Sequence, residues 1–403
     1  MERGMESIFD VFLKKESVFF NKKSLQASFT PKDIPHREEQ RKQLASILAP
    51  CLKNDKPSNI FVYGYTGTGK TLTVKHTTQE LEEVAKRENI NLKVIYVNCK
   101  LKGSADTEYR LIAQLISALG KDNIPITGWP TEEVYRAFIK LLKRQDQNYI
   151  LILDEIDQFV SKAGDNVLYN LTRINEELPD SQISIIGISN NINFVDNLDP
   201  RIKSSLSEEE LVFPPYNAIQ IQDILRQRSE LAFNKDAIEI GVIEKCAAYG
   251  ARDNGDARRS LELLRVSGEV ADRKNSKTVK LEHIDEGEGK IDRDRIIDIV
   301  STQPRQYHLV LYSILSLQNG KSNSSLFTGE VYELYKSLCN KTETSVLTQR
   351  RIADIISEFD MLGILNAKVI SKGRYGRTRD ISMEISEALL PKIKSILEEN
   401  IKL

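Results

Sequence analysis

One short segment, GYTGTGKT at residues 64–71, restricts the fold of this chain more than any other. It lies between the apolar run IFVYG (60–64), which has the length and β-branched character of a strand, and TLTVKHTTQELEEVAKRE, which has helical spacing. The segment fits the pattern G-x-x-x-x-G-K-[S/T], in which glycines allow a sharp turn between a strand and a helix. The sequence therefore predicts a strand–loop–helix unit over residues 60–88.

The same segment contains the first candidate site. Its glycines allow backbone N–H groups to point inward at phosphates, and the N-terminus of the following helix adds a partial positive charge. We expect Lys70 to contact the β- and γ-phosphates of a nucleotide and the Thr71 hydroxyl to bind Mg²⁺. The alternative is a chance match in a glycine-rich turn. The nucleotide contacts predicted in this segment are Gly64, Thr66, Gly67, Thr68, Gly69, Lys70, Thr71 and Leu72.

Three further apolar runs of strand length alternate with helical segments. They are KVIYVNC (93–99), YILILDEID (149–157) and ISIIGISN (183–190). Strands that are apolar at successive positions are typical of a parallel sheet that helices cover on both faces. The alternation predicts a doubly wound α/β domain.

Helical periodicity replaces the strand-like runs after FPPY (213–216). It reaches LEHIDEGEGKIDRDR (281–295), which is consistent with either a linker or the start of a helix. Three more helical patterns then precede NAKVISKGRYGRTRDISMEI (366–385), whose alternation and glycines predict a β-hairpin. That order is typical of a winged helix-turn-helix. We therefore expect a nucleotide-binding α/β domain at residues 1–215, a helical domain at 216–300 and a winged-helix domain at 301–403.

Polar side chains follow two of the predicted strands. Asp154 and Glu155 end the run ILIL, and Asn190 ends ISIIGIS. Because parallel sheets bind ligands at the carboxyl ends of their strands, we expect these side chains beside the phosphate loop. Asp154 would hold Mg²⁺, Glu155 would polarise an attacking water, and Asn190 would orient that water. Taken alone, the Asp-Glu pair also fits a helix N-cap, and Asn190 also fits a turn.

The order of these motifs, together with LDPRIKSSL, FPPY and GDARRSLELL, resembles that of the AAA+ ATPases. The resemblance implies a P-loop doubly wound parallel sheet with a helical lid domain, followed here by the C-terminal winged helix-turn-helix domain. It puts Asn190 at the sensor-1 position. Arg201 falls where such proteins carry an arginine finger directed at a neighbouring subunit's nucleotide. Arg258 falls at the sensor-2 position of the lid, with the adjacent Arg259 as the alternative.

A narrower resemblance covers nearly the whole chain, from about Phe29 to the end. The arm IPHREEQRKQLASIL (34–48), FPPYNAIQIQDILRQR, GDARRSLELLR and the winged helix are similar to the archaeal ORC-type DNA replication initiators. In that family the arm lines the adenine pocket. The resemblance therefore implies base or ribose contacts for Ile34, Pro35, His36 and Arg37, with Tyr216 and Arg228 closing the pocket from the other side. From the residues alone, His36 also fits an ordinary surface histidine and Tyr216 a core tyrosine.

The stretch at about residues 101–132 is longer than a minimal AAA+ core needs. The resemblance implies an initiator-specific helical insertion here, which reaches DNA. Its loop contains Trp129, which either lies against a sugar–phosphate edge or packs on its own helix.

The predicted hairpin has a strongly basic tip, SKGRYGRTRD. Like charges on a tight turn repel one another, and a phosphate backbone relieves that repulsion; the alternative is a solvated surface. Behind a helix-turn-helix we interpret the tip as a wing, and TQRRIADIISEF as the recognition helix. The predicted DNA contacts are Thr348, Gln349, Arg350 and Arg351 in the first turn of that helix, and Lys372, Arg374, Tyr375, Arg377 and Arg379 in the wing.

Composition excludes several classes of protein. The 57 Lys and Arg nearly balance the 58 Asp and Glu, so a DNA-binding surface must be local rather than that of a polycation. The sequence has no apolar run of about 18 residues and no signal-peptide core, which predicts a cytoplasmic, nucleoid-associated protein. Its four cysteines and four histidines are scattered, which excludes a disulfide framework and a zinc knuckle.

These expectations describe an ATP-binding DNA replication initiator. It would recognise double-stranded origin DNA and, in a nucleotide-dependent state, promote recruitment of an MCM-type replicative helicase. The expected cofactors are ATP or ADP and Mg²⁺, and other copies or paralogues of the initiator are expected partners. Weak ATP hydrolysis would act as a switch, because Arg201 completes a site only when a neighbour supplies it. The alternatives are a winged-helix AAA+ motor of the branch-migration type and a nucleotide-gated transcription or signalling regulator.

Overall fold

The structure is a computed structural model, and its described residues are 16–31, 33–100, 107–120, 128–143, 147–194, 196, 198–206, 208–318, 326–371, 377–385 and 389–402. For Val369, Ser371 and Arg377 the description covers the backbone alone. The chain divides into two units, Met1–Ile284 and Asp285–Leu403.

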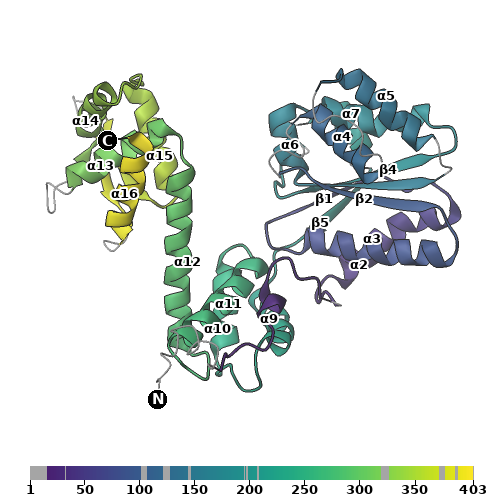
Figure 1. Ribbon diagram of the computed structural model, residues 1–403, viewed down its shortest axis with the longest axis horizontal. Coiled ribbons are helices and arrows are strands. Elements are labelled where there is room, and N and C mark those ends of the chain that lie inside the picture. The colour runs from purple at the N-terminus through teal and green to yellow at the C-terminus, as the bar shows by residue number, and fades with distance from the viewer. Residues whose placement is uncertain are drawn as a thin grey trace, which may run out of the picture. The chain divides into compact units, whose positions relative to one another are not determined.

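The first unit is built on a five-stranded parallel sheet with the strand order β2-β3-β4-β1-β5 (Figure 1). The strands are β1 (Ile60–Gly64), β2 (Leu92–Asn98), β3 (Asn148–Asp154), β4 (Gln182–Ser189) and β5 (Glu209–Phe213). Every residue of β3 is buried, and so is every residue of β4 after the first. Such burial is expected of parallel strands with helices on both faces, and it confirms the predicted doubly wound sheet.

Strand β5 was not expected from the sequence. It lies at the edge of the sheet and pairs with β1 alone among the described strands. Only Leu211 and Phe213 of its five residues are buried. Its apolar run has only three residues, of which Val212 is exposed. Because so short a run does not separate a strand from a loop by periodicity, β1 and its pairing specify β5 more than its own sequence does.

Helices cover both faces of the sheet (Figure 1). On one face α2 (Glu38–Leu48) and α3 (Lys70–Arg87) pack on Ile60 and Val62. Phe61 points to the opposite face, because neighbouring residues of a strand alternate in direction. The helices on that face are α4 (Glu108–Ala118), α5 (Thr131–Leu142), α6 (Ile156–Ala163), α7 (Asn166–Arg173) and α8 (Pro200–Leu206).

A helical lid follows the sheet along the chain. It contains α9 (Ala218–Ala232), α10 (Val242–Arg252) and α11 (Ala257–Arg273). The N-terminal segment packs on this lid: its short 3₁₀ helix η1 (Lys22–Leu25) contacts α9 and α11, and Phe19 forms a β-bridge with Phe233. The sequence had grouped these N-terminal residues with the α/β domain.

Residues 281–302, which the sequence left as a linker or a helix, form the single helix α12 (Leu281–Thr302). Its sequence mixes charged and apolar residues throughout. None of the described helices is both long and apolar enough to cross a membrane.

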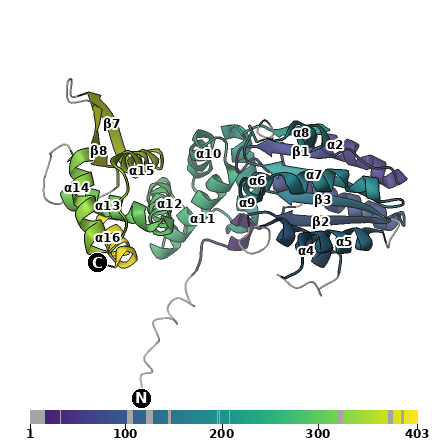
Figure 2. The same cartoon turned by 90° about the horizontal axis from the view of Figure 1, so that it is seen from above.

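The second unit contains a winged helix-turn-helix, as predicted. Its elements are α13 (Arg305–Gln318), β6 (Leu326–Phe327), α14 (Thr328–Lys341), α15 (Gln349–Met361), β7 (Leu365–Ser371), β8 (Arg377–Met383) and α16 (Leu390–Ile401). The predicted hairpin is β7–β8, and Figure 2 shows it beside the recognition helix α15. Two further elements were not expected from the sequence: β6, which pairs with β8, and α16, which packs on α13.

Asn59, just before β1, is a buried polar connection whose loss should weaken the first unit. Its Nδ2 donates to the Ser205 carbonyl (2.7 Å), and its Oδ1 accepts from the Ile185 N–H (2.8 Å). We expect Asn59→Ala to lower the free energy of unfolding by about 2 kcal/mol, because the Ile185 N–H is left buried without its acceptor. Urea unfolding can be followed by the fluorescence of Trp129, the one tryptophan of the chain, which lies in this unit.

The matched control is Asn166→Ala, at an exposed position at the start of α7. Its unfolding free energy should stay within about 0.5 kcal/mol of that of the unaltered protein. Equal stability of the two variants would contradict the importance of the Asn59 contacts.

Candidate functional site

The phosphate loop joins β1 to α3. Gly67 and Gly69 adopt left-handed backbone angles (φ 75° and 87°), which favour glycine, and α3 starts immediately after Gly69. The Lys70 side chain is buried, and its Nζ donates to the carbonyls of Gly64 (2.8 Å) and Tyr65 (2.7 Å). Burial above all, and then the charge of Arg258, lower the pKa of Lys70 to about 8. The loop thus contains a desolvated cation that an anion would stabilise.

Oxygen ligands converge beside Lys70 at the carboxyl edge of the sheet. Asp154 Oδ2 accepts hydrogen bonds from Thr71 Oγ1 (3.0 Å) and from the Tyr96 hydroxyl (2.7 Å). Burial and the Asp154 charge raise the pKa of Tyr96, so this hydroxyl stays protonated and donates. A hydroxyl and a carboxylate at this spacing fit Mg²⁺, which binds proteins through few oxygen ligands and keeps its other positions for water and phosphate.

A polar cavity opens over the phosphate loop. Glu155 and Asn190, the predicted water-polarising and water-orienting residues, both line it. Glu155 has a left-handed backbone (φ 56°), which is unusual outside glycine, and its carboxylate lies 3.3 Å from Lys100 Nζ. The residues lining this cavity are Ala27, Ser28, Gly67, Thr68, Gly69, Lys70, Thr71, Tyr96, Asn98, Asp154, Glu155, Asn190 and Arg258.

A second, mainly apolar cavity adjoins the first, since Ala27, Ser28, Gly67, Gly69, Thr71 and Arg258 line both. Of the residues predicted to surround an adenine, it contains Ile34, Pro35, Tyr216 and Arg228, and Leu72 of the predicted phosphate loop also lines it. Residues 27–31 form one wall of this cavity, and they were not predicted from the sequence. The other lining residues are Lys75, Ile224, Gln227, Ala257 and Leu261.

Four of the predicted nucleotide contacts are not among the described residues that line either cavity: Gly64, Thr66, Arg37 and His36. The backbone of Gly64 packs against Phe213 of β5, and the Thr66 side chain is exposed. Arg37 is buried behind the phosphate loop, where its Nε donates to the Thr68 carbonyl (2.9 Å) and its Nη2 to the Pro214 carbonyl (2.6 Å). Its guanidinium lies 3.8 Å from the centre of the Tyr216 ring. Arg37 thus supports the loop, whereas the resemblance implied that it would contact a base or ribose.

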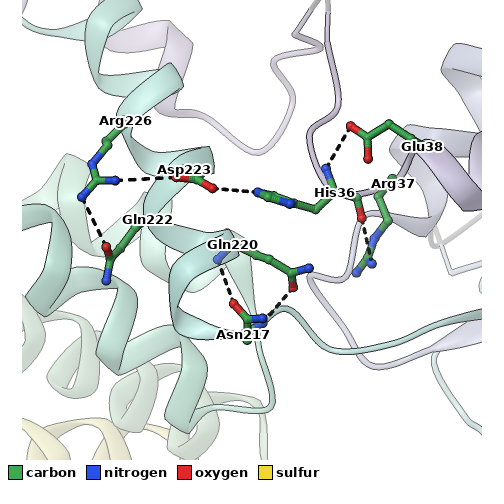
Figure 3. A network of polar contacts seen from close by, with 8 residues as sticks. All are labelled: His36, Arg37, Glu38, Asn217, Gln220, Gln222, Asp223 and Arg226. Carbon is green, nitrogen blue, oxygen red and sulfur yellow. Dashed lines mark hydrogen bonds and ion pairs between the residues drawn. The ribbon is translucent and has the colours of Figure 1, made fainter.

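His36, which belongs to the arm, contacts the lid. Its Nε2 is 3.0 Å from Asp223 Oδ2 on α9, and its backbone N–H donates to Glu38 (Figure 3). Asp223 is also paired with Arg226 (3.6 Å). His36 is therefore placed as a connection between the two subdomains of the unit and is not among the described residues that line either cavity.

The lid meets the phosphate loop at the start of α11. Asp256 caps this helix by accepting from the N–H groups of Arg258 (2.8 Å) and Arg259 (3.1 Å), and the Ala257 N–H donates to the Gly67 carbonyl (3.3 Å). Burial in this contact raises the pKa of Asp256. Of the two adjacent arginines, Arg258 lines both cavities, while Arg259 Nη1 pairs with Asp253 (2.7 Å).

Arg201 lies outside both cavities. Its Nε and Nη2 bind the two oxygens of Asp199 (3.1 and 3.0 Å), and its side chain is 69% exposed. The arginine lowers the pKa of Asp199 to about 2. An exposed guanidinium at this position can reach another molecule.

Two residues that line the polar cavity but were not predicted do carry a signal in the sequence. Tyr96 and Asn98 are polar positions near the end of an apolar strand, and the rule that selected Asp154 and Asn190 applies to them equally. Residues 27–31 gave no such signal, because they contain no charged or motif residue and their position depends on contacts far along the chain.

In the winged helix, the predicted DNA contacts in the first turn of α15 differ in whether their side chains are bound by other residues of the domain. Thr348 caps the helix by accepting from the Arg351 N–H, and Gln349 and Arg350 are exposed. Arg351 is exposed as well, but it donates to the Tyr307 hydroxyl (3.0 Å) and lies 3.4 Å from Glu358. Its guanidinium is therefore held by its own domain.

Arg379, predicted to lie in the wing, is bound to the recognition helix. Its Nη1 donates to the Ala353 carbonyl (3.0 Å) and to the Ser357 hydroxyl. The remaining wing residues Lys372, Arg374 and Tyr375, and the side chain of Arg377, lie outside the described residues, as does much of the predicted insertion (101–106 and 121–127). Trp129, which follows that gap, is 42% exposed.

Three family models match consecutive parts of the chain. They are described as "AAA domain" (residues 53–192), "Cdc6 AAA+ ATPase-type lid domain" (222–289) and "CDC6, C terminal winged helix domain" (298–391). The sheet, the phosphate loop, the lid and the winged helix thus define an AAA+ ATPase of the Cdc6 class.

Proteins that are similar over nearly the whole chain identify a narrower family within this class. The chain is 50% identical over 398 residues to ORC1-type DNA replication protein 1 of Archaeoglobus fulgidus, covering 98% of this chain and 95% of that one. It is 49% identical over 386 residues to the ORC1-type DNA replication protein of Pyrococcus abyssi, covering 95% and 91%. The structure of the Aeropyrum pernix ORC1 protein in complex with DNA matches with a TM-score of 0.83 and 42% identity, covering 96% and 98%. The chain belongs to the family of ORC1-type DNA replication proteins, which confirms the resemblance seen in its motifs.

The contact between Gly67 and the lid gives a prediction for the ligand-free protein. A Cβ at Gly67 would overlap the Asp256 carboxylate and lie 2.9 Å from its Cα. We expect Gly67→Ala to displace the start of α11 and to speed hydrogen exchange at the Arg258 and Arg259 amides about tenfold, which corresponds to about 1.4 kcal/mol. Hydrogen exchange read by mass spectrometry measures this.

Gly329→Ala in α14 is the control, because a Cβ there would meet nothing within 4 Å. It should leave exchange at residues 257–260 unchanged. If Gly67→Ala also left it unchanged, the lid would not depend on this contact.

Proposed function

We propose that this chain is an ATP-binding DNA replication initiator that recognises double-stranded origin DNA. The observation that carries the proposal is the pair of adjoining cavities, one polar and containing Lys70 and Asp154, the other apolar. A nucleotide has the same two parts, an anionic polyphosphate and a base that prefers apolar surroundings. The relationship to ORC1-type DNA replication proteins supports the assignment to replication.

The proposed chemistry follows from the polar cavity. Lys70 and the backbone N–H groups of the loop bind the phosphates, and Arg258 approaches them from the lid. Thr71 and Asp154 would hold Mg²⁺, which when bound neutralises charge on the phosphate oxygens. Glu155 polarises the attacking water and Asn190 orients it. ADP is the product of this reaction, so the proposed ligands of the site are ATP and ADP.

Hydrolysis in the proposed function is slow and acts as a switch. Arg258 of the lid is the one arginine among the described residues that line the polar cavity, whereas Arg201 is exposed and could reach the site of another copy or a paralogue. The nucleotide state would control recruitment of an MCM-type replicative helicase. The proposed site of action is the nucleoid, in the cytoplasm.

DNA binding is proposed for the winged helix and for the insertion that contains Trp129. The relative from Aeropyrum pernix was solved in complex with DNA. On this chain Gln349 and Arg350 are exposed in the first turn of α15, the part of a recognition helix that meets base edges. Thr348 caps that turn, and the wing cations Lys372, Arg374 and Arg377, with Tyr375, would follow the sugar–phosphate backbone.

The decisive experiment is DNase footprinting across the replication origins of the source organism, with promoter fragments for comparison. We expect tight protection at origins that differs between ATP and ADP. Protection confined to promoters would overturn the proposal in favour of a transcription regulator, and hydrolysis strongly stimulated by duplex DNA would favour a motor.

The nucleotide site can be tested with two substitutions that should differ in outcome. Lys70→Ala should abolish ATP binding in calorimetry, because it removes the cation beside the phosphates. Glu155→Gln should keep binding and lower turnover on the order of 10²-fold, because the amide cannot act as a base. Lys86→Ala, at an exposed position on the same helix, is the control and should change neither. Unchanged turnover in Glu155→Gln would show that another group polarises the water.

The two arginines at the start of α15 should respond differently to truncation. Arg350→Ala should weaken DNA binding and reduce the slope of log affinity against log salt by about 1, if its exposed guanidinium neutralises one phosphate. Arg351→Ala should leave this slope unchanged and instead destabilise the domain, because Arg351 binds Tyr307 and Glu358. Equal changes in slope, from fluorescence anisotropy at several salt concentrations, would contradict the distinction.

A further inference from the structure

Residues 17–31 form a continuous segment, the N-terminal strap, that is fastened to the lid. The Phe20 and Asn21 N–H groups both donate to the Ala232 carbonyl (2.8 and 2.9 Å), at the end of α9. The Val18 N–H and the Ser17 hydroxyl bind the two oxygens of Asp272 on α11 (2.8 and 2.7 Å). The strap therefore follows the lid, although about 200 residues separate the two along the chain.

Phe19 is the apolar anchor of the strap. Its ring centre lies 4.7 Å from that of Phe233, and it packs into a notch on α11 at Gly268. A Cβ at Gly268 would overlap the Phe19 ring and lie 2.9 Å from Phe233 Cε1. Glycine inside a helix costs about 1 kcal/mol relative to alanine, so its presence here is explained by the close approach of the strap.

The C-terminal end of the strap forms one wall of the apolar cavity. Residues 27–31 line this cavity, and Ala27 and Ser28 line the polar cavity as well. Arg228 fixes the wall to α9: its Nη2 donates to the carbonyls of Gln26 (3.2 Å) and Phe29 (3.4 Å), and its guanidinium lies 4.5 Å from the centre of the Phe29 ring. Arg228 is 4% exposed, so this fastening is buried.

We infer that the strap is the gate through which a nucleotide leaves, and that Phe19 is a positioning residue that sets how often the gate opens. The inference rests on the proposed nucleotide site. A ligand behind a wall dissociates only when the wall moves, and the frequency of such local opening is set by the contacts that fasten it. Arg228, which holds the wall itself, lines the apolar cavity, whereas the contacts at Phe19, Gly268 and Asp272 are not among the described residues that line either cavity.

The test measures release of ADP from the full-length protein. A fluorescent ADP analogue is bound and then displaced by excess unlabelled ADP in a stopped-flow instrument. Phe19→Ala should raise the dissociation rate about tenfold, because it removes the aromatic contact and the apolar burial that hold the strap. The association rate should not fall, and binding should keep its stoichiometry, because every cavity residue is intact.

Phe20→Ala is the matched control. Phe20 is adjacent in the strap, but its side chain is 81% exposed, so its removal should leave the dissociation rate unchanged. Phe19→Leu, which keeps an apolar side chain in the notch, should restore part of the slow release. Equal rates for Phe19→Ala and Phe20→Ala, or slower association in Phe19→Ala, would overturn the inference.

Gly268→Ala provides an independent route to the same contact. It should speed release by displacing Phe19, and combining it with Phe19→Ala should give less than the sum of the two effects, because the Phe19 ring is already absent and only the contact with Phe233 remains. Additive effects would contradict a shared contact. If the unaltered protein bound no adenine nucleotide, the proposed function itself would fail, whereas nucleotide binding with a release rate indifferent to Phe19 would refute the gate alone.

Discussion

The two cavities of the proposed nucleotide site depend on one buried guanidinium. Arg37 binds the carbonyls of Thr68 in the phosphate loop and Pro214 in the connection to the lid, and it stacks on Tyr216. A planar group with donors on three nitrogens can join such separate backbone segments, which a lysine ammonium on a flexible stem cannot do with the same geometry. Through this contact the arm, the loop and the connection to the lid keep a fixed spacing, and both cavities lie beside it. Burial lowers the pKa of Arg37, but an arginine remains charged at any physiological pH.

The charged side chains beside Lys70 in the polar cavity favour the binding of an anion. Lys70 and Arg258 repel each other, and their mutual effect adds to burial in lowering the pKa of Lys70. Asp154, Asp157 and Asp256 oppose that effect without cancelling it. A phosphate beside Lys70 would raise its pKa again, so binding should fix the proton on this amine. Arg258 of α11 lines the same cavity as Lys70, so a change in the position of α11 would change the charge beside the loop.

The sequence was sufficient for the strands β1 to β4, because each is a continuous apolar run, and for the grouping of Lys70, Thr71, Asp154, Glu155 and Asn190, because the carboxyl ends of parallel strands share one edge. It was not sufficient for β5, because only two residues of this strand are buried and two are too few to show the alternation that identifies a strand. It also could not place Arg37 or Arg351. A motif gives the position of an arginine along the chain, but its five donors can turn toward its own backbone or toward a ligand, and only packing decides. The position of the strap could not be predicted from the sequence for the same reason. The partners of Phe19 are Phe233 and Gly268, which lie far along the chain and which only packing brings to it.

The order in which a ribosome makes these segments has a consequence for the strap. Ser17 and Asp272, which hydrogen-bond to each other, are 255 residues apart. At a synthesis rate of about 5–20 residues per second, the first would wait roughly 10–50 s for the second to be made. During that interval the sheet and the phosphate loop can already fold, while Phe19 has no partner. The apolar wall is therefore a late product of folding, and an emerging chain presents an aromatic N-terminus that chaperones could bind before the lid buries it.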